Sequence, residues 1–169
     1  MNYHIHNFKL KTILLLILIF CKSSVLFASD KKLPIPRFVT IKSSEANIRT
    51  GPNLRYPIKW IFKKKNEPVE VTAEFEHWRK IRDITGEDGW IHESMLKGKR
   101  AAIIIGNDIQ NAYNKTDPSS KINIKIEPEV RVFLSACKIE WCQIKIDNYK
   151  GWIEKKYLWG TYPNEVFDK

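Results

Sequence analysis

The sequence is poor in the side chains that most enzymes use for chemistry. It contains four histidines and three cysteines in 169 residues, and none of them stands in a nucleophile motif or at zinc-finger spacing. A cysteine hydrolase needs a thiolate with a histidine in reach, and a serine hydrolase needs a base with an orienting acid. Since neither set is recognisable, we predict that the chain is not an enzyme, with no catalytic residue, no metal site and no cofactor.

The N-terminal segment lacks an apolar run long enough to cross a membrane. Residues 1–11 carry two lysines and no acid, residues 13–20 are apolar, and residues 21–28 lead to Ala28. This order is typical of a secretory signal peptide, and the apolar run is far shorter than the roughly 20 residues that span a bilayer. We predict cleavage after Ala28, export to the periplasm or cell envelope, and no membrane span thereafter; a retained N-terminal anchor is the alternative.

Acidic residues are in the minority, with 19 Asp and Glu against 29 Lys and Arg. Removal of residues 1–28 takes away three lysines and leaves a net charge of +7, two cysteines, and only His77 and His92 as histidines. A cationic surface suits anionic polymers such as the cell wall or membrane head groups, and export argues against nucleic acid. The alternative is that the lysines, which are scattered among acids, only keep the surface hydrated.

No segment has the spacing of apolar residues that an amphipathic helix needs. Residues 69–75 instead alternate strictly between apolar and polar, which predicts a half-buried strand. The expected inward face of that strand carries Val69, Val71, Ala73 and Phe75. Similar short strands are predicted at residues 38–42, 58–63, 77–84 and 89–92. So many short strands in so short a stretch predict an all-β barrel or sandwich.

The landmarks of the first half return in the same order in the second. Gly89-Trp90-Ile91 recurs 62 residues later as Gly151-Trp152-Ile153, and Trp78 recurs as Trp141. A shared order at nearly constant spacing is what a duplicated domain produces. We therefore predict the following segments: signal peptide 1–28, linker 29–37, first barrel 38–98, second barrel 99–160 and C-terminal tail 161–169.

The two cysteines that remain after export lie close together in the second half. Cys137 and Cys142 flank four residues at the tip of a predicted hairpin, and a unit of about 60 residues is only marginally stable without a further constraint. In an oxidising compartment this spacing predicts a structural disulfide. The alternative is a pair of free thiols packed as small hydrophobic side chains.

A recognisable pattern runs through the first half. Residues 46–52 read Ala-Asn-Ile-Arg-Thr-Gly-Pro and are followed by an alternating strand, Trp78 and the Gly-Trp-Ile stretch at 89–91. In this the chain resembles the bacterial SH3-like domain family over residues 38–97. The second half keeps the ending but lacks the arginine and the glycine at 111–118.

The resemblance implies two tandem small SH3-like β-barrels that act as recognition modules. Such modules are often exported, bind cell-wall peptides or other proteins, and commonly accompany peptidoglycan hydrolases. The sequence carries no hydrolase motif.

Strand phase separates the tryptophans into two pairs. Trp141 faces away from an apolar row on its own strand, and the same phase puts Trp78 on the polar face of its strand. A tryptophan beside cations on an outer face can stack on a ligand, with cover by a neighbouring loop as the alternative. Trp90 and Trp152 stand beside glycines in a predicted barrel strand, where core or barrel-wall packing is expected and a groove-lining edge is the alternative.

The long loop after the first strand supplies further candidate ligand-binding residues. Arg49, Arg55 and Tyr56 lie in or beside it, and loops on a rigid scaffold commonly carry specificity. Arg49 has a structural alternative, which is an ion pair with a carboxylate such as Glu45. We expect Gly51 to provide a positive φ in a turn.

Together these features predict a non-enzymatic exported binding module that recognises cell-wall (peptidoglycan) peptide. The candidate ligand-binding residues are Arg49, Arg55, Tyr56, Trp78 and Trp141. The alternative is an envelope adaptor that binds another protein and has no affinity for the wall. The first copy is the expected binding unit, and the second is a stapled structural partner. The sequence implies no particular oligomeric state.

Overall fold

The computed structural model describes residues 33–168. The predicted signal peptide, residues 1–28, lies outside this range. Residues from Pro34 onward cluster into one unit, which contains both halves of the duplication. In the stretch that the structure describes, no helix has the length and apolar character needed to cross a membrane.

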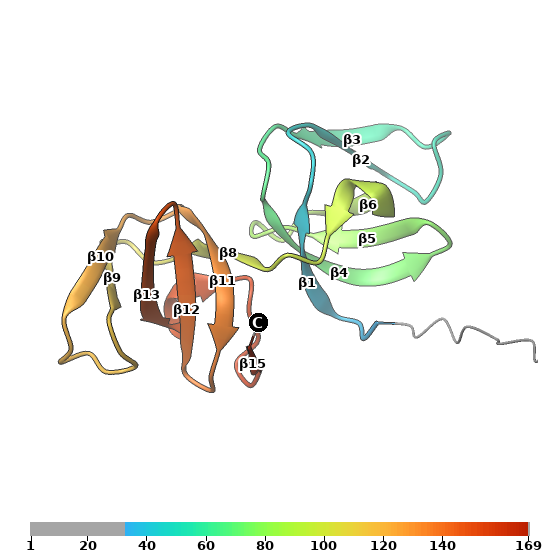
Figure 1. Ribbon diagram of the computed structural model, residues 1–169. Helices are drawn as coiled ribbons and strands as arrows, with labels where there is room; N and C mark the ends of the chain where they lie inside the picture. The colour runs from blue at the N-terminus through green and yellow to red at the C-terminus, as the bar shows by residue number, and fades with distance from the viewer. Residues whose placement is uncertain (1–32, 169) are drawn as a thin grey trace, which may run out of the picture. The chain divides into compact units, whose positions relative to one another are not determined.

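The first half forms a seven-stranded antiparallel sheet in the order β3-β2-β6-β5-β4-β1-β7 (Figure 1). Its strands are β1 (Arg37–Ile41), β2 (Ala46–Arg49), β3 (Ile58–Phe62), β4 (Pro68–Phe75), β5 (Trp78–Arg82), β6 (Asp88–His92) and β7 (Leu96–Lys97). The five strands predicted from the sequence are all present, with ends that differ by at most two residues. Strand β2 was not predicted, because it is short and its residues were assigned to the following loop.

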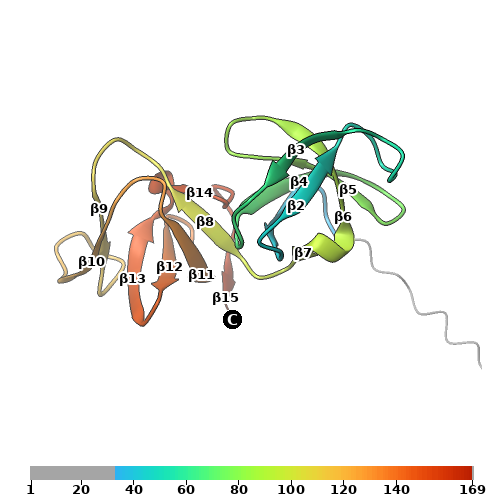
Figure 2. The same ribbon diagram turned by 90° about the horizontal axis from the view of Figure 1, so that it is seen from above.

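The second half repeats this arrangement in the order β10-β9-β13-β12-β11-β8-β14. Its strands are β8 (Ala101–Ile104), β9 (Gln110–Tyr113), β10 (Ile122–Ile126), β11 (Arg131–Cys137), β12 (Trp141–Ile146), β13 (Tyr149–Glu154), β14 (Leu158–Trp159) and β15 (Phe167–Asp168). Short 3₁₀ turns, η1 (Glu93–Met95) and η2 (Lys155–Tyr157), precede β7 and β14, and β14 lies along β8 (Figure 2). The strand order is therefore the same in both halves.

Each half has its own hydrophobic core, built from the inward residues of alternating strands. The first core contains Val39, Ile41, Ala46, Ile48, Val69, Val71, Ile81 and Ile91. The second contains Ala102, Ile104, Ala112, Ile126, Val132, Leu134, Cys137, Cys142, Ile144, Ile153 and Leu158. Burial of one such aliphatic side chain stabilises the fold by about 1.5–3 kcal/mol, so these residues account for the repeated barrel.

The alternation predicted for residues 69–75 breaks in the middle of β4. Val71 is opposite Ile81, but Ala73 is opposite Lys80, so β4 contains one more residue than β5 over this stretch. Such a bulge reverses which side chains face inward beyond it. Phe75, predicted to face the core, is instead 52% exposed, and that prediction was wrong.

The hairpin of β11 and β12 is closed by the predicted disulfide. Cys137 and Cys142 are opposite each other in the ladder, are bonded to each other, and are buried in the second core. This confirms the structural disulfide and fits an oxidising compartment. Residues 161–169 were predicted to be a tail, yet β15 within them pairs with β11.

Candidate functional site

The first half carries a groove of about 380 Å³ on the outer face of β2, β5 and β6. Side chains alternate along these strands, so the neighbours of core residues face outward. The groove is lined by Asn47, Arg49, Leu54, Trp78, His92 and Met95, among others. Two of the five predicted ligand-binding residues, Arg49 and Trp78, therefore share one surface.

Trp78 lies opposite His92 in the ladder between β5 and β6. The two rings meet edge to face with their centroids 5.5 Å apart. Trp78 is only 8% exposed but does not belong to the first core cluster, as expected from its strand phase. Leu54, which is 72% exposed on the 50–57 loop, lines the same groove. The groove thus combines a largely covered indole with an open aliphatic side chain.

Arg49 holds the 50–57 loop against the end of β2. Its Nη1 donates a hydrogen bond of 2.8 Å to the carbonyl oxygen of Tyr56, which is the one hydrogen bond of its guanidinium to the described residues. The alternative ion pair with Glu45 is not formed, because Glu45 pairs with Lys63 at 2.7 Å. A guanidinium has five N–H donors, so Arg49 keeps donors for a ligand.

Arg55 and Tyr56 lie on the rim of the loop and not in the groove lining. Arg55 is exposed, and its backbone N–H donates to Asn53 Oδ1. Tyr56 is 47% exposed, and its ring packs on Gly51, where an added Cβ would lie 2.6 Å from the ring. Gly51 does not have a positive φ, so that prediction was wrong. Glycine is required there by the closeness of the Tyr56 ring.

His92 is the N-cap residue of η1. Its Nδ1 accepts a hydrogen bond of 3.3 Å from Ser94 N and lies 2.8 Å from Ser94 Oγ. The imidazole is thus held at the edge of the groove, with its ring against Trp78.

A smaller hollow of about 190 Å³ adjoins Trp90, with Lys80 and Asp88 in its lining. The hydrogen bond from Lys80 lowers the pKa of Asp88, although burial opposes the shift, and the ion pair measures 2.7 Å. Trp90 and Trp152 are half-buried and belong to neither core cluster. Ile91 and Ile153 occupy the core positions next to them, and Trp90 lines the hollow.

The corresponding face of the second half has a different composition. Arg49 is opposite Trp90 in the first ladder, and Tyr113 is opposite Trp152 in the second. Trp141, the remaining predicted ligand-binding residue, is half-buried and lies edge to face with Tyr113 at 6.0 Å. An aromatic ring therefore occupies the position of the arginine.

Two further cationic or titratable positions also change between the halves. Lys80 is opposite Trp90, whereas Gln143 occupies that position opposite Trp152. His92 is likewise replaced by Glu154. At these three positions the first half therefore has arginine, lysine and histidine, and the second has tyrosine, glutamine and glutamate.

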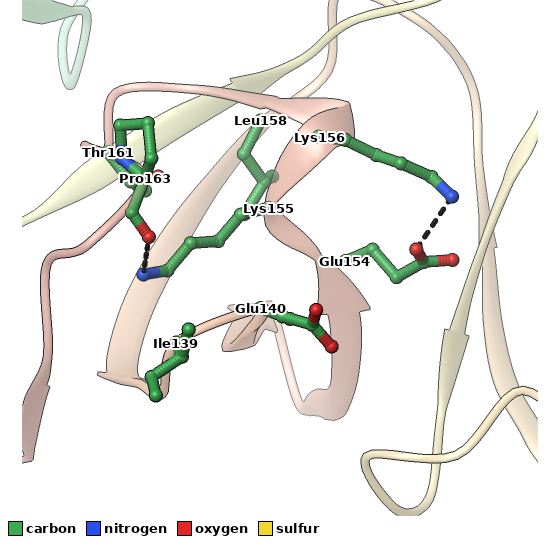
Figure 3. Close-up of a pocket in the computed structure, with 8 residues that line it drawn as sticks. All are labelled: Ile139, Glu140, Glu154, Lys155, Lys156, Leu158, Thr161 and Pro163. Carbon is green, nitrogen blue, oxygen red and sulfur yellow. Dashed lines mark hydrogen bonds and ion pairs between the residues drawn. The ribbon is translucent and has the colours of Figure 1, made fainter.

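A larger cavity of about 560 Å³ lies in the second half, where sequence analysis had placed no site (Figure 3). It is lined by Ile139, Glu140, Glu154, Lys155, Lys156, Leu158, Thr161 and Pro163. One wall is the disulfide-closed hairpin and another is the segment that leads to β15. No local sequence pattern indicates this cavity, because the second wall depends on pairing between residues about 30 positions apart.

Lys155 is buried beside this cavity, and its ammonium group is held by backbone carbonyls. Its Nζ donates to the carbonyl oxygens of Tyr162, Pro163 and Glu165 at 3.4, 3.1 and 2.5 Å. Burial lowers the pKa of Lys155, and the negative charge of Glu165 opposes that shift. The lysine thereby anchors the C-terminal segment.

No trio of His, Cys, Asp or Glu side chains suited to a metal ion occurs within residues 33–168. The side chains of both sites instead provide hydrogen bonds, charge and apolar surface.

Comparison with protein families gives one match that covers both halves. The model of the bacterial SH3 domain matches residues 42–98 and again residues 106–160. The match confirms both the resemblance found in the sequence and the expected tandem of SH3-like barrels. No curated protein sequence matches the chain.

Similar solved structures include two proteins from Trichomonas vaginalis. NlpC2 has 14% identity and a TM-score of 0.35, with 76% of this chain and 49% of that chain covered. NlpC1 has 15% identity and a TM-score of 0.34, with coverage of 80% and 49%. An NlpC/P60 family protein from Bacillus cereus ATCC 10987 has 14% identity and a TM-score of 0.32, with coverage of 72% and 55%. The chain spans about half the length of these proteins.

Proposed function

Because the chain belongs to the bacterial SH3 domain family, we propose that it is a non-catalytic, cell-wall-associated binding protein whose first barrel holds a peptide of peptidoglycan. The proposal rests on the meeting of Arg49, Leu54 and Trp78 in one groove. A guanidinium with unused donors can form a charge-assisted hydrogen bond with a peptide carboxylate. Leu54, together with the small accessible part of Trp78, offers apolar surface to the adjacent side chain of the same peptide.

Retention by purified sacculi tests this proposal. The protein is expected to sediment with sacculi at moderate salt, and Arg49→Gln should weaken retention about tenfold. Arg49 also holds the loop, so its replacement could act through the loop conformation. Leu54→Glu, at a largely exposed position, is therefore the second variant and should also weaken retention. Lys125→Gln removes a charge from an exposed residue of the second barrel and should leave retention by sacculi unchanged. Failure of the unmodified protein to sediment with sacculi would contradict the proposal.

Export is part of the same proposal. Disulfides such as Cys137–Cys142 form and persist in oxidising compartments. The order of charged and apolar residues before Ala28 is typical of a signal peptide. Mass spectrometry of protein recovered from the periplasm or envelope should give an N-terminus at Ser29. An intact N-terminal methionine would instead favour the retained anchor.

An adaptor role is the second candidate, and it is supported by exposed apolar residues on β3. Ile58 and Ile61 are 45% and 39% exposed, and β3 is at the edge of its sheet, where a further strand can add. An adaptor would be retained by a defined envelope protein and not by sacculi. Ile61→Glu would then lower that retention, whereas it should leave sacculus binding unchanged.

A further inference from the structure

At one pair of equivalent positions, the acidic and the basic residue are exchanged between the two barrels. In the first barrel, Glu93 N donates to His77 O at 2.9 Å, and in the second, Lys155 N donates to Glu140 O at 2.8 Å. The same backbone contact thus places Glu140 where the first barrel has His77, and Lys155 where it has Glu93. The acid and the base have exchanged positions.

The side chains of this pair behave differently in the two barrels. In the first, His77 Nδ1 and Glu93 Oε1 are 2.8 Å apart and form a pair. In the second, Lys155 turns its ammonium group to three carbonyls of the C-terminal segment. Glu140 is consequently left exposed, with no hydrogen-bond or ion-pair partner for its carboxylate among the described residues.

Charge balance around the cavity leaves one uncompensated group. The ammonium of Lys155 is occupied by carbonyls, and Lys156 forms an ion pair of 2.6 Å with Glu154. Among the lining residues, Glu140 alone has a formal charge that is not met by a partner. The two acids and two lysines of the lining sum to zero formal charge, and Glu140 is the lining carboxylate that no described residue pairs with.

The cavity also offers apolar surface beside this carboxylate. Figure 3 shows Ile139 and Glu140 on one side of the hollow, with Leu158 and Pro163 on the other. Ile139 is 69% exposed, so its side chain is accessible to a ligand. Ile139 and Glu140 lie between the two disulfide-bonded cysteines, so the wall that they form is held in place before a ligand binds.

We propose that this cavity binds an alkylammonium group, such as the side chain of a lysine-type residue in a peptide. The ammonium pairs with the carboxylate of Glu140, while the methylenes lie on Ile139, Leu158 and Pro163, as amphipathic side chains do on apolar surface. The site lies on the other barrel and requires the opposite charge from the groove of Arg49. It does not rest on the function proposed for that groove.

Titration with small probes, followed by amide shifts in nuclear magnetic resonance, tests the site. Nα-acetyl-lysine methylamide should shift the resonances of residues 139–141 and 154–163 in a saturable manner. Nα-acetyl-norleucine methylamide has the same aliphatic stem without the ammonium and should not. Cadaverine, a free diamine, shows whether the natural ligand is a free amine or a peptide side chain. Tighter binding of cadaverine than of the lysine probe indicates a free amine, and weaker binding indicates a peptide side chain.

Matched variants locate the contact. Glu140→Gln should weaken the lysine probe about fivefold to tenfold, whereas Glu127→Gln removes an exposed carboxylate of the same barrel and should leave the affinity unchanged. Glu140→Lys should abolish binding. Equal binding of the lysine and norleucine probes, absence of saturable shifts, or unchanged affinity in Glu140→Gln would overturn the proposal. A negative result for sacculi concerns the first barrel only and leaves this result intact.

Discussion

Gly89 and Ile48 approach so closely across the first barrel that a Cβ on the glycine would lie 2.4 Å from Ile48 Cγ2. The second barrel has the same contact, because a Cβ on Gly151 would lie 2.8 Å from Ala112 Cβ. Both glycines are buried and immediately precede the half-buried tryptophans. Close contact between strands thus explains why the Gly-Trp-Ile landmark occurs twice.

Replacement of Gly89 by alanine should destabilise the first barrel. The added methyl group overpacks the contact with Ile48, which costs about 1–3 kcal/mol of the free energy of unfolding. Gly98→Ala is the matched control, because an added Cβ there meets nothing within 4 Å. Urea denaturation should separate the two variants. Equal midpoints would show that the contact does not constrain the fold.

The fold was largely predictable because its signals are local. The Gly-Trp-Ile spacing and the alternation of short strands indicated two small β-barrels, and the cysteine spacing indicated the disulfide. The bulge in β4 was not predictable, since it depends on the register with β5 and not on the sequence of β4 alone. Phe75 was consequently assigned to the wrong face.

The candidate sites were predictable only in part. Strand phase placed Trp78 outside the first core cluster, but the side chain is only 8% exposed, and its role as a ligand-binding residue stays a prediction. Proximity in sequence put Arg49 beside the loop that it holds. The cavity of the second barrel depends on the pairing of β15 with β11 and on the path of Lys155 Nζ to the carbonyls of that segment. No local pattern signals either contact, so Glu140 was not a candidate.

Loss of the disulfide should destabilise the second barrel. Cys137 and Cys142 close a short loop, and the chain-entropy model gives about 2 kcal/mol of stabilisation for a loop of this size. The double variant Cys137→Ser, Cys142→Ser should lower the denaturation midpoint of the second barrel and leave that of the first unchanged. Site-resolved hydrogen exchange provides the measurement. Equal loss of protection from hydrogen exchange in both barrels would contradict the prediction that the disulfide stabilises only the second barrel.

Lys155 should be required for the C-terminal segment to hold its position. Lys155→Met keeps the aliphatic stem but leaves three carbonyl oxygens without their donor, at a cost of about 1–3 kcal/mol. Lys156→Met is the matched control, because its ion pair with Glu154 lies at the surface, where such pairs contribute little to stability. The amides of Tyr162 and Glu165, both hydrogen-bonded in this segment, should exchange faster in Lys155→Met only.

Low pH should destabilise the C-terminal segment, because Glu165 is protonated there. Burial raises the pKa of this carboxyl, but the hydrogen bond and positive charge of Arg100 outweigh burial, so its pKa lies below the ordinary value of 4.5. Arg100 donates to both carboxylate oxygens, with 2.9 Å between Nη2 and Oε2. A carboxyl whose pKa is lower in the folded state stabilises the fold above its unfolded pKa. That stabilisation is lost as the pH falls through the folded pKa.

Glu165→Gln should therefore reduce the pH dependence of stability below about pH 4.5. The variant is expected to be less stable than the unmodified protein at neutral pH, and the two should converge as the solution is acidified. Glu127→Gln, at an exposed position, should follow the unmodified protein throughout. Thermal unfolding measured at a series of pH values gives the comparison. A constant difference between Glu165→Gln and the unmodified protein at all pH values would show that the ion pair with Arg100 does not govern the acid response.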